Sequence, residues 1–449
     1  MRYTIRLFCV LVLVAAAFGQ DVAITVYNQN RALVREIRAL KLASGRSTVS
    51  FTDVAALIDP TSVHFKSLTA PEKVQLLEQN YEYDLVSAQK VLEKYVDETV
   101  RLVMEGGEVF DGVLLNGSQS NIVLKAQDGS IKVIRGEGVR HFEFPELPEG
   151  LITRPTLVWD LENGGPSSQQ IEVSYLTGGM NWHAEYVAVS DADDAHLDLG
   201  GWVSVENRSG TAFKDAKLKL VAGDVNLVQP ERVLRRSIQK QDVLLAAEPE
   251  PRFEEKAFFE YHLYTLGRKT TLKNNQTKQI ALFPPTRTKT EKIFMFDGAS
   301  DKKVRVHLEF QNKKKDGLGL PLPKGKIRVY KTDDDGAQEF IGEDEIDHTP
   351  MDETVRIFLG NAFDLTGERV QQSTRRISDR AREESYAITL RNHKDDNVDI
   401  VVVEHFWGDW TVSGNSHAFT KKDVRTLEFR VPVTAKGEAI LTFKVTLKW

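Results

Sequence analysis

The sequence predicts a mainly β protein that consists of several antiparallel β-sandwich domains and one short helix. Apolar and polar residues alternate along several segments, which is typical of strands with one buried face. Turn-forming Asp, Asn and Gly residues separate these segments. One further stretch has apolar side chains at the spacing of a helix. At roughly 100–200 residues per domain, the 449 residues suffice for two to four domains with sizeable cores.

Residues 1–19 are expected to form a cleavable signal peptide. Two arginines flank the start, the apolar run 7–18 follows, and Ala17 and Gly19 provide small residues before the cleavage point. The run is shorter than the roughly 20 residues needed to cross a bilayer, so we expect no transmembrane span in the mature chain. Cleavage would remove Cys9, the one cysteine of the chain. The predicted location is therefore periplasmic or extracellular.

The first part of the mature chain, residues 20–96, is expected to form an N-terminal β unit that ends in a short helix. Apolar side chains at helical spacing between Leu85 and Tyr95 predict this helix. Residues 97–145 are expected to form a small barrel inserted after the helix. Residues 146–228 are expected to form a β-sandwich.

The second part of the chain begins with residues 229–255, a charged stretch that predicts an inter-domain linker or a long exposed loop. Strict alternation over 303–310 and 441–449 predicts strands, so we expect a C-terminal β-sandwich region over 256–449. The polar stretch 374–384 is compatible with a helix, an extended hairpin arm or a loop.

The composition and the motifs argue against several functional classes. The 59 Lys and Arg residues against 65 Asp and Glu residues give a net charge of −6, so no basic field indicates a nucleic-acid partner. The ten histidines are scattered, and no pair has the helical spacing of a zinc protease. The sequence contains no phosphate-binding loop, no dinucleotide fingerprint and no Gly-x-Ser-x-Gly motif. A binding protein is therefore expected ahead of an enzyme.

An acidic cluster is the best candidate for a metal site. Calcium prefers several carboxylate oxygens from one short loop, which makes calcium the expected ion if the cluster binds a metal. The spacing lacks the Gly and the distal Glu of an EF-hand, so a solvated acidic turn is the alternative that the sequence favours. The cluster consists of Asp191, Asp193, Asp194 and Asp198.

A second cluster combines carboxylates with a histidine, namely Glu343, Asp344 and His348. Paired carboxylates perform glycoside hydrolysis when they meet in space, so this cluster is a candidate binding or hydrolytic site. Hydrogen bonding at the rim of a sandwich is the structural alternative.

An aromatic cluster near the C-terminus is the third candidate site. Trp407 and Trp410, together with Asp409, could bind a sugar ring at the end of a strand. Tryptophans also fill cores and sandwich edges, which is the structural alternative for this cluster.

The segments 100–125 and 131–144 contain a set of spaced residues, namely Gly107, Gly112, Leu114, Asn121, Leu124 and the run Ile134-Arg135-Gly136. With these residues the two segments resemble the two halves of the Sm-like fold, a five-stranded small barrel. In that family the asparagine and the Arg-Gly pair help to line an RNA site on a ring of subunits. The expected export argues against RNA, and the same residues have structural uses as bends and turns. We therefore expect a structural or protein-contact barrel and no nucleic-acid binding.

Four longer stretches of the mature chain, 145–159, 178–186, 316–330 and 341–369, carry a second resemblance. Through them, most of the mature chain resembles an uncharacterised bacterial envelope family, the mucoidy inhibitor A-like proteins. The chain differs from those relatives because the Sm-like segment replaces their long coiled-coil insertion. The resemblance implies an envelope protein and provides no catalytic residues. We expect a non-enzymatic scaffold, adaptor or surface-binding protein whose partner is an envelope protein or a surface polysaccharide, with a carbohydrate-active or metal-dependent hydrolase as the alternative.

Overall fold

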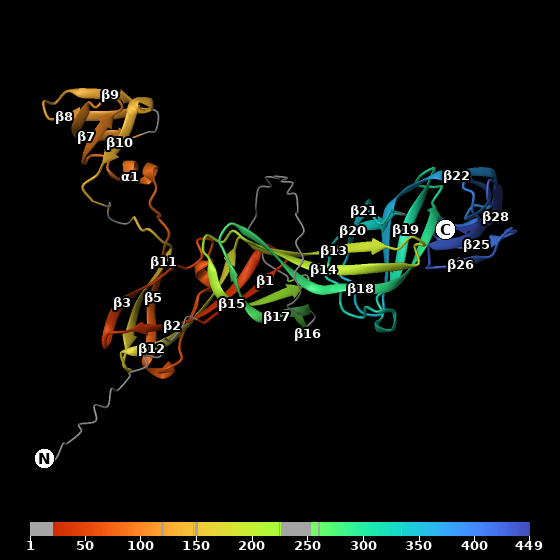
Figure 1. The fold of residues 1–449 in the computed structure, drawn as a ribbon, viewed down its shortest axis with the longest axis horizontal. Coiled ribbons are helices and arrows are strands. Elements are labelled where there is room, and N and C mark those ends of the chain that lie inside the picture. Colours follow the sequence, from red (N-terminus) through yellow and green to blue (C-terminus); the bar gives the residue numbers. More distant parts are fainter. Residues whose placement is uncertain are drawn as a thin grey trace, which may run out of the picture.

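The computed structural model describes residues 21–449 except 118–120, 147, 149–150, 224, 226–252, 259–260 and 334. The predicted signal peptide and most of the predicted linker 229–255 lie outside the described residues. The fold is mainly β, with several sheets and one α-helix in the part described, which confirms the predicted fold class (Figure 1). Short 3₁₀ helices occur at Pro60–Ser62, Pro71–Lys73, Gly136–Gly138 and Lys314–Asp316.

Two sheets face each other in the N-terminal half. The larger sheet contains, in spatial order, β16 (Phe253–Phe258), β17 (Tyr261–Leu272), β15 (Phe213–Ala222), β1 (Asp21–Tyr27), β2 (Arg31–Lys41), β12 (Ser168–Gly178) and β4 (His64–Ser67). The smaller sheet contains β3 (Gly45–Thr52), β11 (Thr156–Asn163) and β5 (Val74–Glu82). The ring of Phe65 on β4 lies 5.0 Å from that of the fully buried Trp159 on β11, so aromatic packing joins the two sheets.

A small module, formed by residues 88–143, is inserted between β5 and β11. It begins with helix α1 (Ala88–Lys94), whose first turn is capped by the Ser87 side chain. Its sheet has the order β10 (Val139–Glu143), β6 (Thr99–Met104), β7 (Val109–Gly117), β8 (Asn121–Ala126) and β9 (Ile131–Arg135). Leu92 of the helix joins a separate core with Leu102, Leu114 and Leu124. No ladder joins β9 to β10 in the described residues, so the predicted closed barrel is not confirmed.

The remaining strands form one long sheet, which shares one core with the first two sheets and has a second core in its C-terminal part. Its main path is β21 (Gln338–Ile346), β20 (Gly325–Thr332), β13 (Met180–Ser190), β14 (His196–Asn207), β18 (Gln276–Phe296), β19 (Lys303–Gln311), β22 (Thr354–Ser378), β23 (Ala381–Asn392), β28 (Glu438–Lys448) and β25 (Asp409–Ser413). Beside this path lie β24 (Val398–His405), β27 (Thr426–Val433) and β26 (Phe419–Lys421). The long strand β18 pairs with β14 in its first half and with β19 and β24 in its second half, so it connects the two cores.

Strands from the separately predicted units share sheets. β1 from the predicted unit 20–96 pairs in parallel with β15 from the predicted unit 146–228. β13 from that second unit pairs in parallel with β20 from the predicted region 256–449. Backbone pairing therefore interleaves these three units. The polar stretch 374–384 forms the end of the β22–β23 hairpin, which selects the hairpin arm from the three alternatives.

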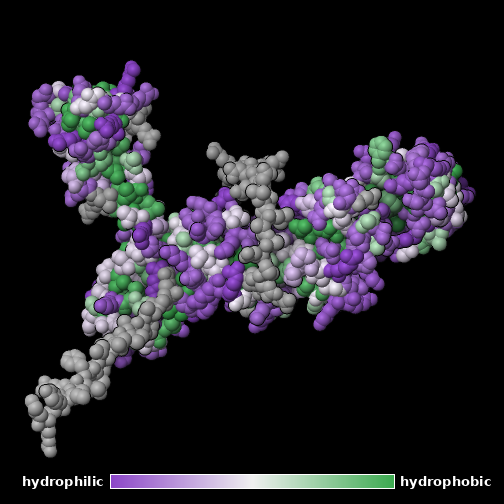
Figure 2. All heavy atoms as spheres, in the orientation of Figure 1, coloured by the Kyte–Doolittle hydropathy of each residue, from purple (hydrophilic) through white to green (hydrophobic). Residues whose placement is uncertain are grey.

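The molecule is elongated, and the small module stands at one end, away from the C-terminal strands (Figure 1). Figure 2 shows a mostly hydrophilic visible face, with hydrophobic side chains in the small module and along the connection to it. None of the helices in the described ranges is long and apolar enough to cross a membrane.

Candidate functional site

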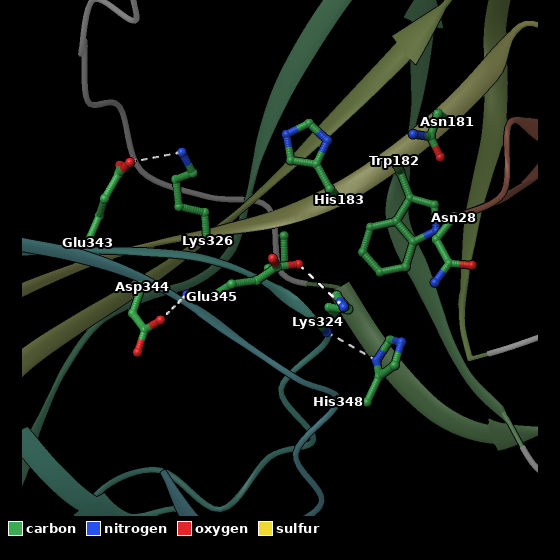
Figure 3. A pocket seen from close by; sticks show the side chains of 12 residues that line it. Asn28, Asn181, Trp182, His183, Lys324, Lys326, Glu343, Asp344, Glu345 and His348 are labelled. Carbon is green, nitrogen blue, oxygen red and sulfur yellow. Dashed lines mark hydrogen bonds and ion pairs between the residues drawn. The ribbon is translucent and has the colours of Figure 1, made fainter. Parts of the chain in front are cut away.

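The predicted cluster Glu343, Asp344 and His348 lines an open cleft of about 440 Å³ (Figure 3). This volume lies within the range of ordinary ligand pockets, which is about 300–1,000 Å³. The first two residues lie on β21, and the histidine lies in the loop that follows it. Antiparallel pairing of β21 with β20, and parallel pairing of β20 with β13, brings side chains from three strands to this cleft.

The carboxylates on β21 are held by cations from β20 and the loop before it. The Glu343 carboxylate lies 3.1 Å from Lys326 Nζ and 3.4 Å from Arg328 Nε. The Lys324 ammonium lies 3.4 Å from the carboxylate of Glu345. On this wall of the cleft, carboxylate acceptors therefore alternate with lysine and arginine donors, and each carboxylate named here is already paired with a cation.

Asp344 and His348 are positioned by backbone groups. Asp344 Oδ2 accepts a hydrogen bond of 2.7 Å from the Phe358 backbone N–H of the neighbouring strand β22. His348 Nδ1 accepts one of 3.1 Å from the Lys324 backbone N–H. An accepting ring nitrogen carries no hydrogen, so the neutral imidazole of His348 has its hydrogen on Nε2. Backbone contacts thus fix both side chains at the edge of the cleft.

The opposite wall contains residues that the sequence analysis did not single out, namely Asn28, Asn181 and His183. The two residues on β13 occupy outward positions of a strand that buries every second side chain. This alternation is the sequence signal that could have identified them. The Oδ1 atom of Asn28 is shielded from solvent and has no hydrogen-bond partner in the described residues, so a ligand or water could use it.

Glu185, two residues after His183, is the most strongly perturbed carboxyl beside this cleft. The contact with the His183 ring, at 3.6 Å, is the largest cause that lowers the pKa of Glu185, to about 2 from its ordinary 4.5. Burial opposes this change, whereas the Ser204 hydroxyl, at 3.0 Å, favours it. The carboxylate of Glu185 is therefore ionised throughout the physiological range. The cleft as a whole can bind a polar ligand through both donors and acceptors.

The structure places the acidic cluster in and beside the β13–β14 hairpin, where basic groups contact three of its four members. Asp191 contacts the His196 ring and Arg287, each at 3.0 Å. Asp194 is buried and contacts Lys331 at 2.7 Å as well as Lys292.

The same Arg287 lies 3.7 Å from Asp198, while Asp193 is exposed. In the described parts of the chain, no group of three or more His, Cys, Asp or Glu side chains is arranged to hold a metal ion. Salt bridges account for the contacts of the cluster, which favours the acidic turn over the calcium alternative.

In the structure, Trp407 and Trp410 of the predicted aromatic cluster lie in different surroundings. Trp410 is partly buried: its Nε1 donates to the Val424 carbonyl at 2.8 Å, and its ring packs 5.8 Å from that of Phe406. Trp407 is 72% exposed and lines a different cleft from the one described above. Asp409 is exposed at the start of β25. These three residues therefore do not form one joint site.

A comparison with models of known protein families matched none of them to this chain, and a comparison with curated protein sequences also gave no match. The resemblances to the Sm-like fold and to the mucoidy inhibitor A-like family therefore stay predictions.

Proposed function

We propose that the protein is an exported, non-enzymatic scaffold or adaptor of the cell envelope that binds an envelope protein or a surface polysaccharide. The expected signal peptide and the resemblance to an envelope family support export. The observation that carries the proposal is the small module, which projects from the end of the β5–β11 ladder with its own hydrophobic core (Figure 1). A projecting module separates a contact surface from the main sheets, as a scaffold requires.

The surface of the module supports a role in protein contact. Strand β9 is at the edge of its sheet, where backbone groups on one side have no ladder partner in the described residues. Ile131 and Val133 on this strand are 56% and 68% exposed. Exposed apolar side chains on an edge strand favour pairing with another chain. We therefore assign the protein contact to the module.

The proposal is tested by in-cell cross-linking and mass spectrometry on native envelopes. We expect a recurrent partner cross-linked to residues 97–145, and loss of these cross-links in Val133→Glu. The matched control is Phe363→Ser, which changes a 96% exposed side chain on β22 of the long sheet. Recovery of the protein in the cytosol would contradict the proposed export, and the absence of a recurrent protein partner would contradict the protein contact assigned to the module.

A hydrolase remains the second candidate because Glu343, Asp344 and His348 do converge on one cleft. The discriminating experiment incubates purified protein with polysaccharide extracted from the native envelope and measures the release of reducing ends. We expect no release. Turnover that Glu343→Gln or Asp344→Asn abolishes would establish the hydrolase instead.

A further inference from the structure

A second cleft, of about 470 Å³, lies on the C-terminal part of the long sheet. Its position follows from strand pairing: β28 pairs with β23 on one side and with β25 on the other. Trp407 comes two residues before β25, and Trp449 comes directly after β28. Gly408 between Trp407 and β25 has φ +76°, and an added Cβ would lie 2.6 Å from the Lys448 carbonyl oxygen. A glycine at this position thus lets the chain bend and places Trp407 at the cleft.

The walls of the cleft are exposed aromatic rings. Trp407 and Trp449 are 72% and 64% exposed, although both have large apolar faces. The Arg425 guanidinium lies 4.2 Å above the centroid of the Trp407 ring but does not line the cleft. It therefore covers one face of Trp407 and fixes the orientation of the ring, while the rest of the indole lines the cleft.

The polar groups of the cleft form a connected network. Arg382 Nε lies 2.7 Å from the carboxylate of Glu384, which is 6% exposed and accepts the hydroxyl hydrogen of Tyr386 at 2.6 Å. Arg369 makes two hydrogen bonds of 2.8 and 2.9 Å to the buried carboxylate of Glu404. Both arginines that line the cleft are therefore paired with buried carboxylates.

This pairing indicates the charge of the ligand. An arginine that recognises a carboxylate or phosphate uses its parallel N–H donors for that anion. Here buried carboxylates already balance both guanidinium charges. A neutral ligand with adjacent donors and acceptors is the better match, because it can add hydrogen bonds at the outer edge of the Arg382–Glu384 pair without breaking it.

We propose that this cleft binds a neutral oligosaccharide. The apolar C–H face of a sugar ring stacks on Trp407 and Trp449, and two adjacent hydroxyl groups bond the Arg382 donors and the Glu384 acceptor. The inference rests on the proposed function, because it names the class of polysaccharide that the scaffold binds. It replaces the predicted Trp407–Trp410 pair with Trp407 and Trp449.

The test is isothermal titration calorimetry on the purified full chain with three probes: β-1,4-linked glucose hexasaccharide, β-1,4-linked mannose hexasaccharide and hexagalacturonate. We expect at least one neutral probe to bind, and Trp407→Ala and Trp449→Ala each to weaken it by about tenfold or more. Arg382→Met is expected to weaken the same probe, because it keeps the length of the side chain and removes the donors.

Two matched controls are available. Phe363→Ala removes an exposed aromatic ring from another part of the same sheet, and Trp410→Phe changes the tryptophan that lies outside the cleft. Both should bind the probe within about twofold of the original chain. Failure of both neutral probes, tighter binding of hexagalacturonate, or equal weakening by the controls would overturn the inference. Absence of a recurrent protein partner in cross-linking of the original chain would contradict the protein contact assigned to the module while leaving the calorimetric result intact.

Discussion

Glu185 shows how a single residue beside the first cleft links structure to pH. Its pKa is lowered in the folded chain to about 2, chiefly by the contact with the His183 ring, whereas the ordinary value is 4.5. The unfolded chain therefore binds a proton at higher pH than the folded chain does. It follows that the stabilisation by Glu185 is present above about pH 4.5 and is lost as the pH falls toward about 2.

We predict that Glu185→Gln removes this part of the acid sensitivity. The free energy of unfolding of the original chain should fall by about 1–2 kcal/mol more than that of the variant between pH 5 and pH 2. Urea denaturation at a series of pH values measures this difference. Glu206→Gln, on the neighbouring strand β14, is the control and should keep the original slope. Identical slopes for Glu185→Gln and the original chain would refute the prediction.

Asp194 allows a residue-scale test of the calcium expectation. Burial acts to raise the pKa of Asp194, but the hydrogen bonds from Lys292 and Lys331 lower it below its ordinary value. These lysines occupy the carboxylate oxygens that a calcium ion would need. We predict that Asp194→Ala destabilises the chain by about 1–3 kcal/mol, and that millimolar calcium leaves the Tm of the original chain unchanged. A calcium-dependent rise in Tm that Asp194→Ala abolishes would show a metal site instead.

At the scale of the elements, the pairing of β7 with β8 requires the backbone of β8 to lie close to Gly112. An added Cβ at this central position would lie 2.7 Å from the Lys125 carbonyl oxygen of β8. We predict that Gly112→Ala destabilises the small module by about 1–3 kcal/mol, because the β7–β8 pair must separate to admit a methyl group. Hydrogen exchange over residues 99–143 measures this change. Gly106→Ala is the control, since an added Cβ there meets no atom within 4 Å; an equal effect in both variants would contradict the prediction.

Element types could be predicted from the sequence because they depend on local patterns. Alternation over 303–310 corresponds to β19, and helical spacing between Leu85 and Tyr95 corresponds to α1. The pairing of strands could not be predicted, because alternation identifies a buried face and not the strand beside it. The parallel pair β1–β15 joins segments that are distant in the sequence.

The same limit applies to the candidate sites. Glu343, Asp344 and His348 were found because they are close in sequence, whereas His183 reaches their cleft only through the pairing of β13 with β20. Trp410 is near Trp407 in sequence, but it packs toward Phe406 and Val424. A site can thus be identified from the sequence when its residues are close together in the chain. It cannot be identified when its residues come from distant strands that only the pairing of the sheet brings together.

At the scale of the whole molecule, the small module is an insertion between the ends of two paired strands, β5 and β11. Glu82 at the end of β5 and Thr156 at the start of β11 are register partners, so the chain leaves and re-enters the small sheet at one place. An isolated parallel bridge between Leu85 and Ile152 joins the two connections again on the way to the module. The two connections therefore run together, and a short loop could join them.

We predict that replacing residues 88–148 with a short Gly-Ser loop leaves the remaining sheets folded. The main cores draw no residue from this segment, so their buried contacts are unchanged. Calorimetry should show loss of the unfolding transition of the module, with the other transitions within about 2 °C of their original temperatures. The shortened chain should keep oligosaccharide binding at the C-terminal cleft and lose the protein cross-links assigned to the module. Loss of all cooperative unfolding would show that the module is part of the main fold and would remove the structural basis for an adaptor.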